Sequence, residues 1–385
     1  MPVKLLHIVG ARPQFIKYFP IQQAIALAQT DSSKGSDIPR QTQQDALNTG
    51  SLTSILVHTG QHYDYNLSKI FFVELGIHRP DYHLEVGSGT HGQQTAMVIQ
   101  RTEEVLLKEK PDVVVVYGDT NSTLGGALAA SKLHIPVAHV EAGLRSFNKR
   151  MPEEINRILT DHVSACLFCP SETAVNNLRL EGFLDASSRA FDSALVLNVG
   201  DVMYDILLHA TGIAEEKSRI LDHLHIMPKG YDLLTLHRAE TTDDPERLAE
   251  IINFVNEVAA QTPIIFPMHP RMAKAYAGTR GAFQENVRII KPLGYFDLVK
   301  VLKNAHRLLT DSGGMQKEAY WLGIPCITLR DETEWLETVQ SGWNILWRDY
   351  RGEHDPHGQP NAYGDGRAAI KMIDVLRERT ICRHG

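Results

Sequence analysis

The sequence predicts a doubly wound α/β protein made of two Rossmann-like domains. Short β-branched runs alternate with longer amphipathic segments, and continuous apolar strands separated by helices are typical of parallel sheets covered on both faces. The chain has 385 residues, and domains of about 150 residues predict two of them. The rhythm of strands weakens between about residues 185 and 194. Because ligands bind outside the carboxyl ends of such strands, we expect a cleft between the two domains.

The domain boundaries and the expected elements follow the same rhythm. Residues 1–194 are expected to form an N-terminal domain and residues 195–366 a C-terminal domain, with a closing helix over 367–385 that packs back on the N-terminal domain. Two polar stretches, Thr30–Gly50 and Arg351–Gly366, have the Gly, Pro, Ser and Gln content of loops. The predicted strands are KLLHIV, SILVH, DVVVVYG, IPVAHV and CLFCPS in the first domain, and DLLTLH, IIFPMH, VRII, HRLLTD and PCITL in the second.

The composition argues against several classes of protein. No apolar run reaches the roughly 20 residues of a membrane span, and the N-terminal MPVKLLHIVGARP lacks the cleavage pattern of a signal peptide, so we expect a cytoplasmic protein. The formal net charge of -7 argues against nucleic acid as the main partner. Four cysteines are too few for a disulfide framework. Cys166 and Cys169 lie in a predicted buried strand without a second metal-ligand pair, which favours a structural role.

The segments that follow the first-domain strands carry charged residues. In GARPQFIK, Gly10 permits a sharp turn and Pro13 suits the first turn of a helix. Arg12 and Lys17 place cations near that helix N-terminus and indicate an anion-facing site, although the glycine spacing differs from that of a Walker P-loop. In GDTNST, Asp119 follows a buried strand, where an isolated aspartate is usually a helix cap.

The stretch HVEAGLRSFNKRMPEEINR gathers carboxylates and guanidiniums after the next strand. Glu141 takes the same position after its strand as Asp119, and Glu153 shares a helix face with Arg157, four residues later. An exposed ion pair is one interpretation. The other is that Asp119, Glu141 and Glu153 converge on one sheet edge and raise one another's proton affinity, as an acid and a base near neutral pH require. Of the other charged residues in this stretch, Glu154 and Arg150 are expected to face water, and Arg145 is left unassigned.

Two histidines stand at strand ends in the second half. His237 directly follows a strand in LLTLHRAE, and His269 is similarly placed in IIFPMHPRM. Either ring could cap or pack locally, but two such endings in neighbouring strands favour a shared site.

The segment LLTDSGGMQKEAYWLGIP is the most specific of the second half. Ser312, Gly313 and Gly314 follow a strand and open a helix, so their backbone N–H groups can point at a phosphate without obstruction. Glu318 lies one to two turns further on, where a carboxylate can hold ribose hydroxyls. Arg330, after PCITL, is expected to face the same cleft. Together these residues indicate a nucleotide diphosphate.

These motifs, in this order, resemble those of a known family. GARPQFIK, GDTNST, HVEAGLRS, MPEEINR, LHRAE and TDSGGMQKEA are similar to the motifs of the non-hydrolysing UDP-N-acetylglucosamine 2-epimerases, and the likeness runs to about Trp347. The resemblance implies a GT-B type fold, a UDP-sugar substrate, no cofactor and no metal. It also implies a homodimer and a role in supplying sugars for surface polysaccharide.

The resemblance further implies a mechanism. Members of this family interconvert UDP-N-acetylglucosamine and UDP-N-acetylmannosamine by eliminating UDP to a glycal and adding it back after the C2 proton returns on the other face. By position, Asp119, Glu141 and Glu153 match the acid–base carboxylates. The positions that match sugar-nucleotide and diphosphate contacts are Arg12, Lys17, Arg157 and His237, the last also grouped with the catalytic residues. The diphosphate turn of the family is matched by Ser312, Gly313 and Gly314, and its ribose contact by Glu318. His269 and Arg330 match further ligand contacts.

Two departures from the family pattern bear on substrate and regulation. Members activated by a second UDP-N-acetylglucosamine carry Gln-His-Arg after the second strand, whereas TGQHYDYN gives Gln61, His62 and Tyr63, which puts that allosteric site in doubt. Trp335 stands where the common form has an Arg-Pro pair. This second departure resembles the branch that acts on UDP-2,3-diacetamido-2,3-dideoxyglucuronate, so that sugar is the alternative substrate.

Three other functions compete with epimerisation. A GT-B glycosyltransferase would use the same Ser-Gly-Gly turn, but the three carboxylates disfavour it. A sugar-nucleotide sensor would bind without turnover, and an intact set of acidic positions argues against that. The hydrolysing branch of the family usually carries a fused kinase domain, for which 385 residues leave no length.

Overall fold

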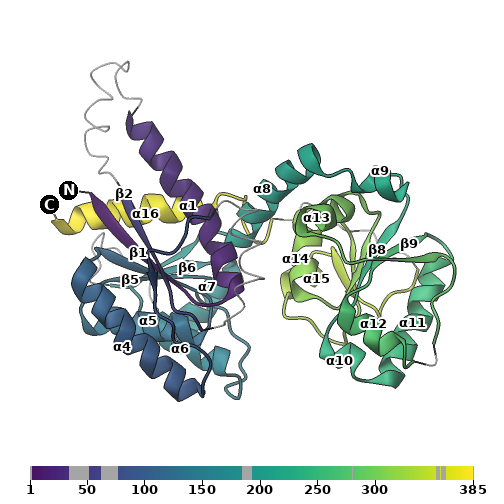
Figure 1. Cartoon of the computed structure of the whole chain (residues 1–385), viewed down its shortest axis with the longest axis horizontal. Coiled ribbons are helices and arrows are strands. Elements are labelled where there is room, and N and C mark those ends of the chain that lie inside the picture. The colour runs from purple at the N-terminus through teal and green to yellow at the C-terminus, as the bar shows by residue number, and fades with distance from the viewer. Residues whose placement is uncertain are drawn as a thin grey trace. The chain divides into compact units, whose positions relative to one another are not determined.

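A computed structural model of the chain describes residues 2–33, 52–61, 77–183, 193–279, 281–352, 356 and 361–384. The chain forms two compact units (Figure 1). The first unit comprises Met1–Ile206 and Tyr363–Gly385, and the second comprises Leu207–Ala362.

The first unit is built on a seven-stranded sheet in which every pairing is parallel. The strand order β3-β2-β1-β4-β5-β6-β7 reverses direction between β1 and β4, and ligands bind at such a switch point. Its elements are β1 (Val3–Val9), α1 (Arg12–Ser33), β2 (Leu52–His58), β3 (Tyr82–His83), α4 (His91–Glu109), β4 (Val113–Tyr117), α5 (Asn121–Lys132), β5 (Val137–Val140), α6 (Pro152–Val163), β6 (Cys166–Cys169), α7 (Glu172–Leu180), β7 (Leu195–Asn198), the start of α8 (Val202–Lys217) and α16 (Ala368–His384).

The second unit repeats the same winding with a six-stranded parallel sheet. Its order, β10-β9-β8-β11-β12-β13, reverses between β8 and β11. Its elements are α9 (Ile220–Leu224), β8 (Asp232–Thr235), α10 (Ala239–Thr242), α11 (Pro245–Ala259), β9 (Ile264–Pro267), α12 (Pro270–Tyr276), β10 (Val287–Ile290), α13 (Tyr295–Asn304), β11 (Leu308–Thr310), α14 (Gly313–Trp321), β12 (Cys326–Thr328), α15 (Leu336–Gln340) and β13 (Asn344–Leu346).

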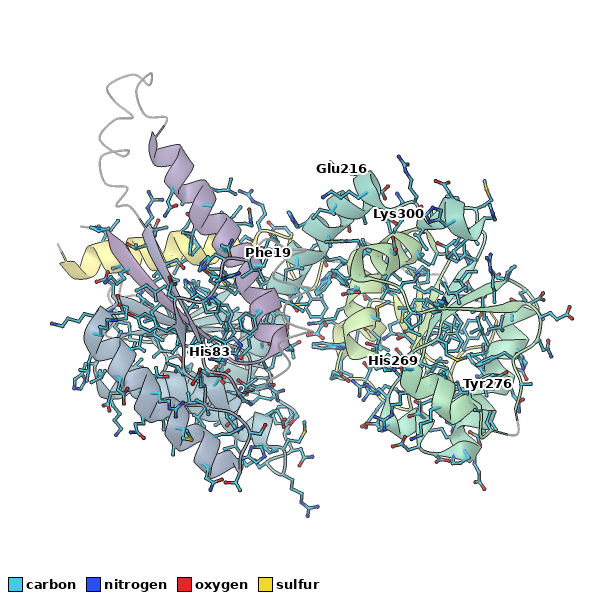
Figure 2. The ribbon with its side chains drawn as sticks, in the orientation of Figure 1. Phe19, His83, Glu216, His269, Tyr276 and Lys300 are labelled. Atoms are coloured by element: carbon cyan, nitrogen blue, oxygen red, sulfur yellow. The ribbon has the colours of Figure 1, made fainter. Side chains whose placement is uncertain are left out.

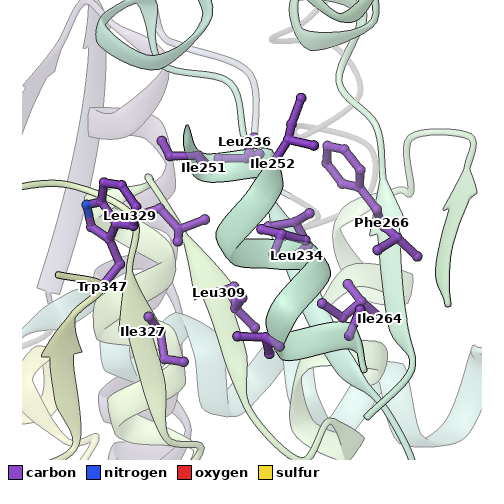
Figure 3. Close-up of a cluster of buried hydrophobic side chains, with 14 of the residues drawn as sticks. Leu234, Leu236, Ile251, Ile252, Ile264, Phe266, Leu309, Ile327, Leu329 and Trp347 are labelled. Carbon is purple, nitrogen blue, oxygen red and sulfur yellow. The ribbon is translucent and has the colours of Figure 1, made fainter. Parts of the chain in front are cut away.

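The inner strands of the second unit, β8, β9, β11 and β12, are buried on both faces, which explains their continuous apolar sequences. Leu234 and Leu309 pack with Ile251 of α11 in one apolar cluster (Figure 3). Their neighbours Leu233 and Leu308 point the other way and belong to a second cluster with residues of α13 and α14. The period of two along each strand therefore divides the core into two layers.

Local sequence sets where several helices begin. Thr90 before α4 and Thr120 before α5 each form a capping box with the residue three positions later. Asp244 accepts hydrogen bonds from the first backbone N–H groups of α11, whose first residue is Pro245. These caps fix the first turns of α4, α5 and α11.

The division of the chain differs in position from the expected one. The expected N-terminal domain ends at residue 194, but β7 pairs with β6 and completes the first sheet. The units divide inside α8, between Ile206 and Leu207. The polar stretch before β7 does not end the first unit, because β7 is paired with β6 in the same sheet. The C-terminal helix α16 contacts α1 and β1 of the first unit, beside which Figure 1 shows it in yellow.

The predicted fold class of two doubly wound parallel α/β units is confirmed. None of the described helices is both long and apolar enough to cross a membrane. Cys166 and Cys169 lie in the buried strand β6, as predicted, and burial raises the pKa of the Cys166 thiol to about 11. The expected loop Thr30–Gly50 begins too early, because α1 continues to Ser33.

Candidate active site

At the switch point of the first unit, one buried amide braces the turn after β1. Gln14 accepts hydrogen bonds from the backbone N–H groups of Gly10 and Ala11, at 2.7 and 3.0 Å. Its amide donates to the carbonyl oxygen of Tyr117, at the end of β4, and to the hydroxyl of Thr123. The side chain thus ties the two strand ends together. Sequence reasoning missed it, because a glutamine in a first helical turn is usually solvated.

Gly10 has a different role from the expected one. Its φ is not among the positive values of the chain, so no left-handed turn requires glycine there. A Cβ at this position would overlap the side chain of Ser122, and the close approach of α5 is what excludes larger residues. Ser122 in turn donates from its backbone N–H and hydroxyl to Gln61. His62 and Tyr63, of the segment in which Tyr63 puts the allosteric site in doubt, lie outside the described residues.

The first unit places a buried ion pair at this edge. Lys17 of α1 is buried and its ammonium group pairs with the carboxylate of Glu141, which follows β5 and is 15% exposed. Burial alone would lower the pKa of Lys17, but the carboxylates of Glu141, Asp119 and Asp201 outweigh it and raise that pKa. Arg12 is the first residue of α1, and its side chain lies outside the described residues. A carboxylate fixed beside an ammonium at a strand end has the geometry of a proton donor or acceptor.

Arg157 joins two carboxylates, one of them unexpected. Its guanidinium pairs with Asp119 at 2.6 Å and with Glu154 at 2.9 Å. Glu154 was expected to face water, and that expectation is wrong, because its residue is 1% exposed. Its carboxylate also accepts hydrogen bonds from the backbone N–H groups of Ser146 and Phe147. Burial alone would raise the pKa of Glu154, but these contacts outweigh it and lower the pKa.

Glu153 lies on the outer face of the same helical turn. It is exposed and has no ion pair within the described part of the chain, so the expected contact with Arg157 is made by its neighbour Glu154 instead. Arg150 is exposed, as expected. The reason is geometric: positions three and four apart are both neighbours on a helix, and tertiary contacts decide between them.

A buried network lies beneath these charges. The two ring nitrogens of His139 lie 2.6 Å from the Asp161 carboxylate and 2.7 Å from the carbonyl oxygen of Gly118, and both of these oxygen atoms accept hydrogen bonds. Asp161 also pairs with Arg145, whose guanidinium binds Glu181 through two nitrogens. Arg145, unassigned from the sequence, is therefore a buried structural cation. Burial alone would raise the pKa of Asp161, but His139 and Arg145 outweigh it and lower that pKa.

At the switch point of the second unit, a buried carboxylate holds the histidine loop. Asp311 is 0% exposed and accepts hydrogen bonds from the backbone N–H groups of His237 and Arg238, at 3.0 and 2.9 Å. The ring of His237 lies 5.8 Å from that of His269, between centroids, so the two predicted histidines are neighbours. His269, labelled in Figure 2, is also the N-cap of α12. Asp311 stands in the motif TDSGG, which sequence reasoning valued only for its glycines.

The predicted diphosphate turn has the expected local structure. Ser312 is the N-cap of α14, and its side chain accepts a hydrogen bond from the backbone N–H of Met315. Gly313 and Gly314 are the first two residues of that helix, and Gly314 is exposed. Backbone N–H groups at such a start carry partial positive charge and suit an anion.

Glu318 lies further along α14, where Tyr295 donates a hydrogen bond of 3.3 Å to its carboxylate. Burial raises the pKa of Glu318 to about 7, although Tyr295 and Lys317 act in the opposite direction. A carboxyl group whose pKa is raised in this way is ionised or protonated depending on small changes in pH. When ionised it accepts hydrogen bonds from hydroxyl groups, and when protonated it can also donate one.

Arg330 is paired with a carboxylate that sequence reasoning did not single out. It follows β12, its side chain is 11% exposed, and it binds Glu334 at 2.7 Å. Glu334 also lies 3.7 Å from Arg238. The second unit therefore brings His237, His269, the Ser312 turn and Arg330 to one sheet edge. Within the described residues, no group of His, Cys, Asp and Glu side chains is arranged to hold a metal ion.

Comparison with known proteins adds a family to this geometry. The family model for UDP-N-acetylglucosamine 2-epimerase matches residues 45–377. A UDP-N-acetylglucosamine 2-epimerase homolog of Methanococcus maripaludis is 47% identical over 390 residues, which cover 97% of this chain and 99% of the relative. The UDP-2,3-diacetamido-2,3-dideoxy-D-glucuronate 2-epimerase of Pseudomonas aeruginosa is 48% identical over 350 residues, which cover 89% and 88%.

A solved structure shares both sequence and fold. The crystal structure of Methanocaldococcus jannaschii UDP-GlcNAc 2-epimerase in complex with UDP-GlcNAc and UDP is 40% identical, with a TM-score of 0.70. The match covers 98% of this chain and 99% of that one. With a family model over most of its length and relatives of this identity, the chain is an isomerase that belongs to the UDP-N-acetylglucosamine 2-epimerase family.

Proposed function

We propose that this protein is a non-hydrolysing 2-epimerase that interconverts UDP-N-acetylglucosamine and UDP-N-acetylmannosamine. The observation that carries the proposal is the likeness, over 98% of this chain, to an epimerase whose crystal structure holds UDP-GlcNAc and UDP. A homodimer, a cytoplasmic location and a role in surface polysaccharide synthesis stay predictions.

The proposed reaction is an elimination followed by an addition. A base removes the proton from C2 while the C1–O bond to UDP breaks, and a C1–C2 double bond forms. The proton returns to C2 on the opposite face, and UDP adds again at C1. The chemistry therefore needs a base that removes the proton from C2, an acid that returns a proton on the other face, and a set of cations for the departing diphosphate.

The first unit supplies the candidates for proton transfer. Glu141 and Asp119 stand at neighbouring strand ends, paired with Lys17 and Arg157 respectively. Each cation keeps its carboxylate in place without covering the sheet edge entirely, because Glu141 is 15% and Asp119 30% exposed. Glu153 is exposed and is the third candidate. A positioned acid or base of this kind contributes about 10² to 10⁴ in rate.

The second unit supplies the candidates for nucleotide binding. We infer that the N–H groups at the start of α14 bind the diphosphate and that Glu318 binds the ribose, with His237, His269 and Arg330 completing the contacts. The cations supply the charge stabilisation that the leaving group needs.

A second substrate is favoured by one specific observation. Trp335 replaces the Arg-Pro pair of the common form, and the 48% identical Pseudomonas aeruginosa relative is a UDP-2,3-diacetamido-2,3-dideoxy-D-glucuronate 2-epimerase. The second candidate function is therefore 2-epimerisation of that diacetamido sugar.

One experiment tests both candidates. Purified protein is incubated in D₂O with each UDP-sugar in turn, and NMR follows C2. We expect deuterium at C2 together with the epimer that has the manno configuration, for one of the two substrates. Absence of exchange with both would refute epimerisation. Exchange with the diacetamido sugar alone would assign the second candidate, and transfer to an added acceptor without exchange would identify a glycosyltransferase.

A further inference from the structure

The chain's own side chains lie close to Gly313, the first residue of α14, whereas a Cβ on Gly314 would meet only Ser312 Oγ, at 4.0 Å. A Cβ on Gly313 would lie 2.5 Å from Glu334 Oε1, 3.1 Å from Trp335 Nε1 and 3.5 Å from Arg238 Nη2. Because Cα–Cβ bonds in a helix tilt towards its N-terminus, these atoms stand where an anion would approach the first N–H groups. The carboxylate of Glu334 is the nearest of them.

Glu334 is also held by the cations of this edge. Its Oε2 accepts a hydrogen bond of 2.7 Å from Arg330, and its Oε1 lies 3.7 Å from Arg238. A second carboxylate, Glu240, lies 4.0 Å from Arg238 and 3.9 Å from Arg330, and its side chain is 67% exposed, against 45% for Glu334. Both guanidiniums are therefore shared with acidic residues, and of these two carboxylates Glu334 is the one that lies near the helix start.

We propose that Glu334 is an internal counter-anion that occupies the diphosphate position and must leave it when the nucleotide binds. This inference rests on the proposed function, since it assumes that the Ser312 turn receives a diphosphate. A phosphate in contact with the first N–H groups of α14 would stand beside the Glu334 carboxylate, and two anions at such a distance repel each other. Binding therefore requires Arg330 and Arg238 to exchange Glu334 for phosphate.

The exchange weakens nucleotide affinity in a way that serves turnover. The product of the proposed reaction is a UDP-sugar, so the site cannot hold the UDP moiety too tightly, because the epimer must depart. A carboxylate that returns to the cations as the UDP-sugar leaves neutralises them and favours its release. Glu334 thus sets the affinity of the site without touching the reacting carbon atoms.

The test compares binding to variants that each remove one negative charge from this edge or its surroundings. Glu334→Gln keeps the shape and a hydrogen-bond acceptor for Arg330 but removes the charge. Glu240→Gln removes a charge from the same pair of arginines without exposing the helix start. Glu332→Gln removes one from an exposed position of the same segment and serves as the matched control. Isothermal titration calorimetry of the full chain measures the affinity for UDP and for inorganic diphosphate.

We expect Glu334→Gln to bind both UDP and diphosphate roughly tenfold more tightly than the unmodified protein. Glu240→Gln should gain less and Glu332→Gln should stay near the unmodified value. Glu334→Asp, which keeps the charge on a shorter side chain, should fall between Glu334→Gln and the unmodified protein. An affinity of Glu334→Gln equal to or below that of the unmodified protein would overturn the inference. So would an equal gain in Glu240→Gln, because net charge alone would then explain it.

The outcome is separable from the proposed function. Exchange at C2 is measured independently by NMR on the unmodified protein. If that protein binds UDP but shows no exchange, epimerisation fails and the comparison of variants still decides the role of Glu334. If it binds neither UDP nor diphosphate, the inference fails together with the nucleotide site.

Discussion

Glu141 combines two demanding conditions at a single residue. Its φ of +73° lies in the left-handed region, and its carboxylate is ion-paired with a buried lysine. A residue with a side chain in that region costs on the order of 1–3 kcal/mol, and such strain collects at functional sites. The backbone N–H of Glu141 donates to the carbonyl oxygen of Phe168, which helps to hold this conformation.

The ion pair gives the first prediction at the residue scale. Lys17→Met leaves the Glu141 carboxylate buried without its partner, and we expect the free energy of unfolding to fall by about 3 kcal/mol. The double variant Lys17→Met/Glu141→Gln should recover most of that loss, because no unpaired charge remains, yet it should stay inactive. Urea denaturation and the C2 exchange assay measure the two effects.

The matched control for this prediction is a less buried pair of the same unit. Lys4 and Glu109 are paired at 3.4 Å with side chains 35% and 20% exposed. Lys4→Met should cost less than about 1 kcal/mol, as exposed pairs do. Equal losses in Lys4→Met and Lys17→Met would contradict the assignment of a buried pair.

At the scale of elements, a buried hydrogen-bond network holds the junction between β5 and α6. His139 belongs to β5 and Asp161 to α6, and their contact links the strand to the helix. His139 also reaches the carbonyl oxygen of Gly118, and Asp161 accepts from the backbone N–H of Gly143 at 3.2 Å. The loops that carry Asp119 and Glu141 are therefore fixed by one buried network.

This network predicts a defined dependence of stability on pH. The folded protein lowers the pKa of Asp161, so in the folded state this carboxyl releases its proton more readily than in the unfolded chain. Its contribution is therefore complete above the unfolded value of about 3.9 and is lost as pH falls through the lower folded value. We expect Asp161→Asn to destabilise the protein at pH 7 by about 3 kcal/mol and to weaken the acid-induced loss of stability.

The measurement is chemical denaturation of both proteins at pH 7 and at several values below 4. Asp365, an exposed carboxylate paired with Lys371, gives the control variant Asp365→Asn. The prediction is contradicted if Asp161→Asn and Asp365→Asn change stability equally at pH 7, since burial is the stated cause.

At the scale of the whole molecule, the two units repeat one winding but differ in chemistry. Both sheets reverse strand order after their first three strands, and each carries charged residues after its strand ends. The first unit has the carboxylates of Asp119 and Glu141, and the second has the Ser312 turn and two arginines. The proposed function thus assigns proton transfer to the first unit and nucleotide binding to the second.

This separation predicts that the second unit binds UDP by itself. Leu207–Ala362 is one continuous stretch of chain with its own apolar clusters. A fragment of these residues should unfold cooperatively and bind UDP, measured by circular dichroism and calorimetry, but should show no C2 exchange because it lacks the carboxylates. A fragment that folds but fails to bind UDP would contradict the assignment of the nucleotide site to this unit.

The sequence by itself determined ten strands of this protein and the positions of its charged strand ends, whereas β3, β7 and β13 were not predicted. Continuous apolar runs, in place of alternating apolar and polar residues, indicate parallel strands buried on both faces. The residues that follow such strands lie at one edge of the sheet. Lys17, Glu141 and Asp119 were found in this way, as was the turn at Ser312. The local sequence pattern was sufficient for these residues, because the end of each apolar run marks the end of its strand.

Only the tertiary structure decided which charges are buried and with what partner. Glu153 and Glu154 are both within reach of Arg157 along a helix, and the backbone N–H groups of Ser146 and Phe147 select Glu154. In the same way Arg145 is a buried partner of Asp161, and Glu334 reaches the start of α14 from a segment that follows a later strand. Such contacts join residues from different elements, and their geometry depends on packing that no local pattern encodes.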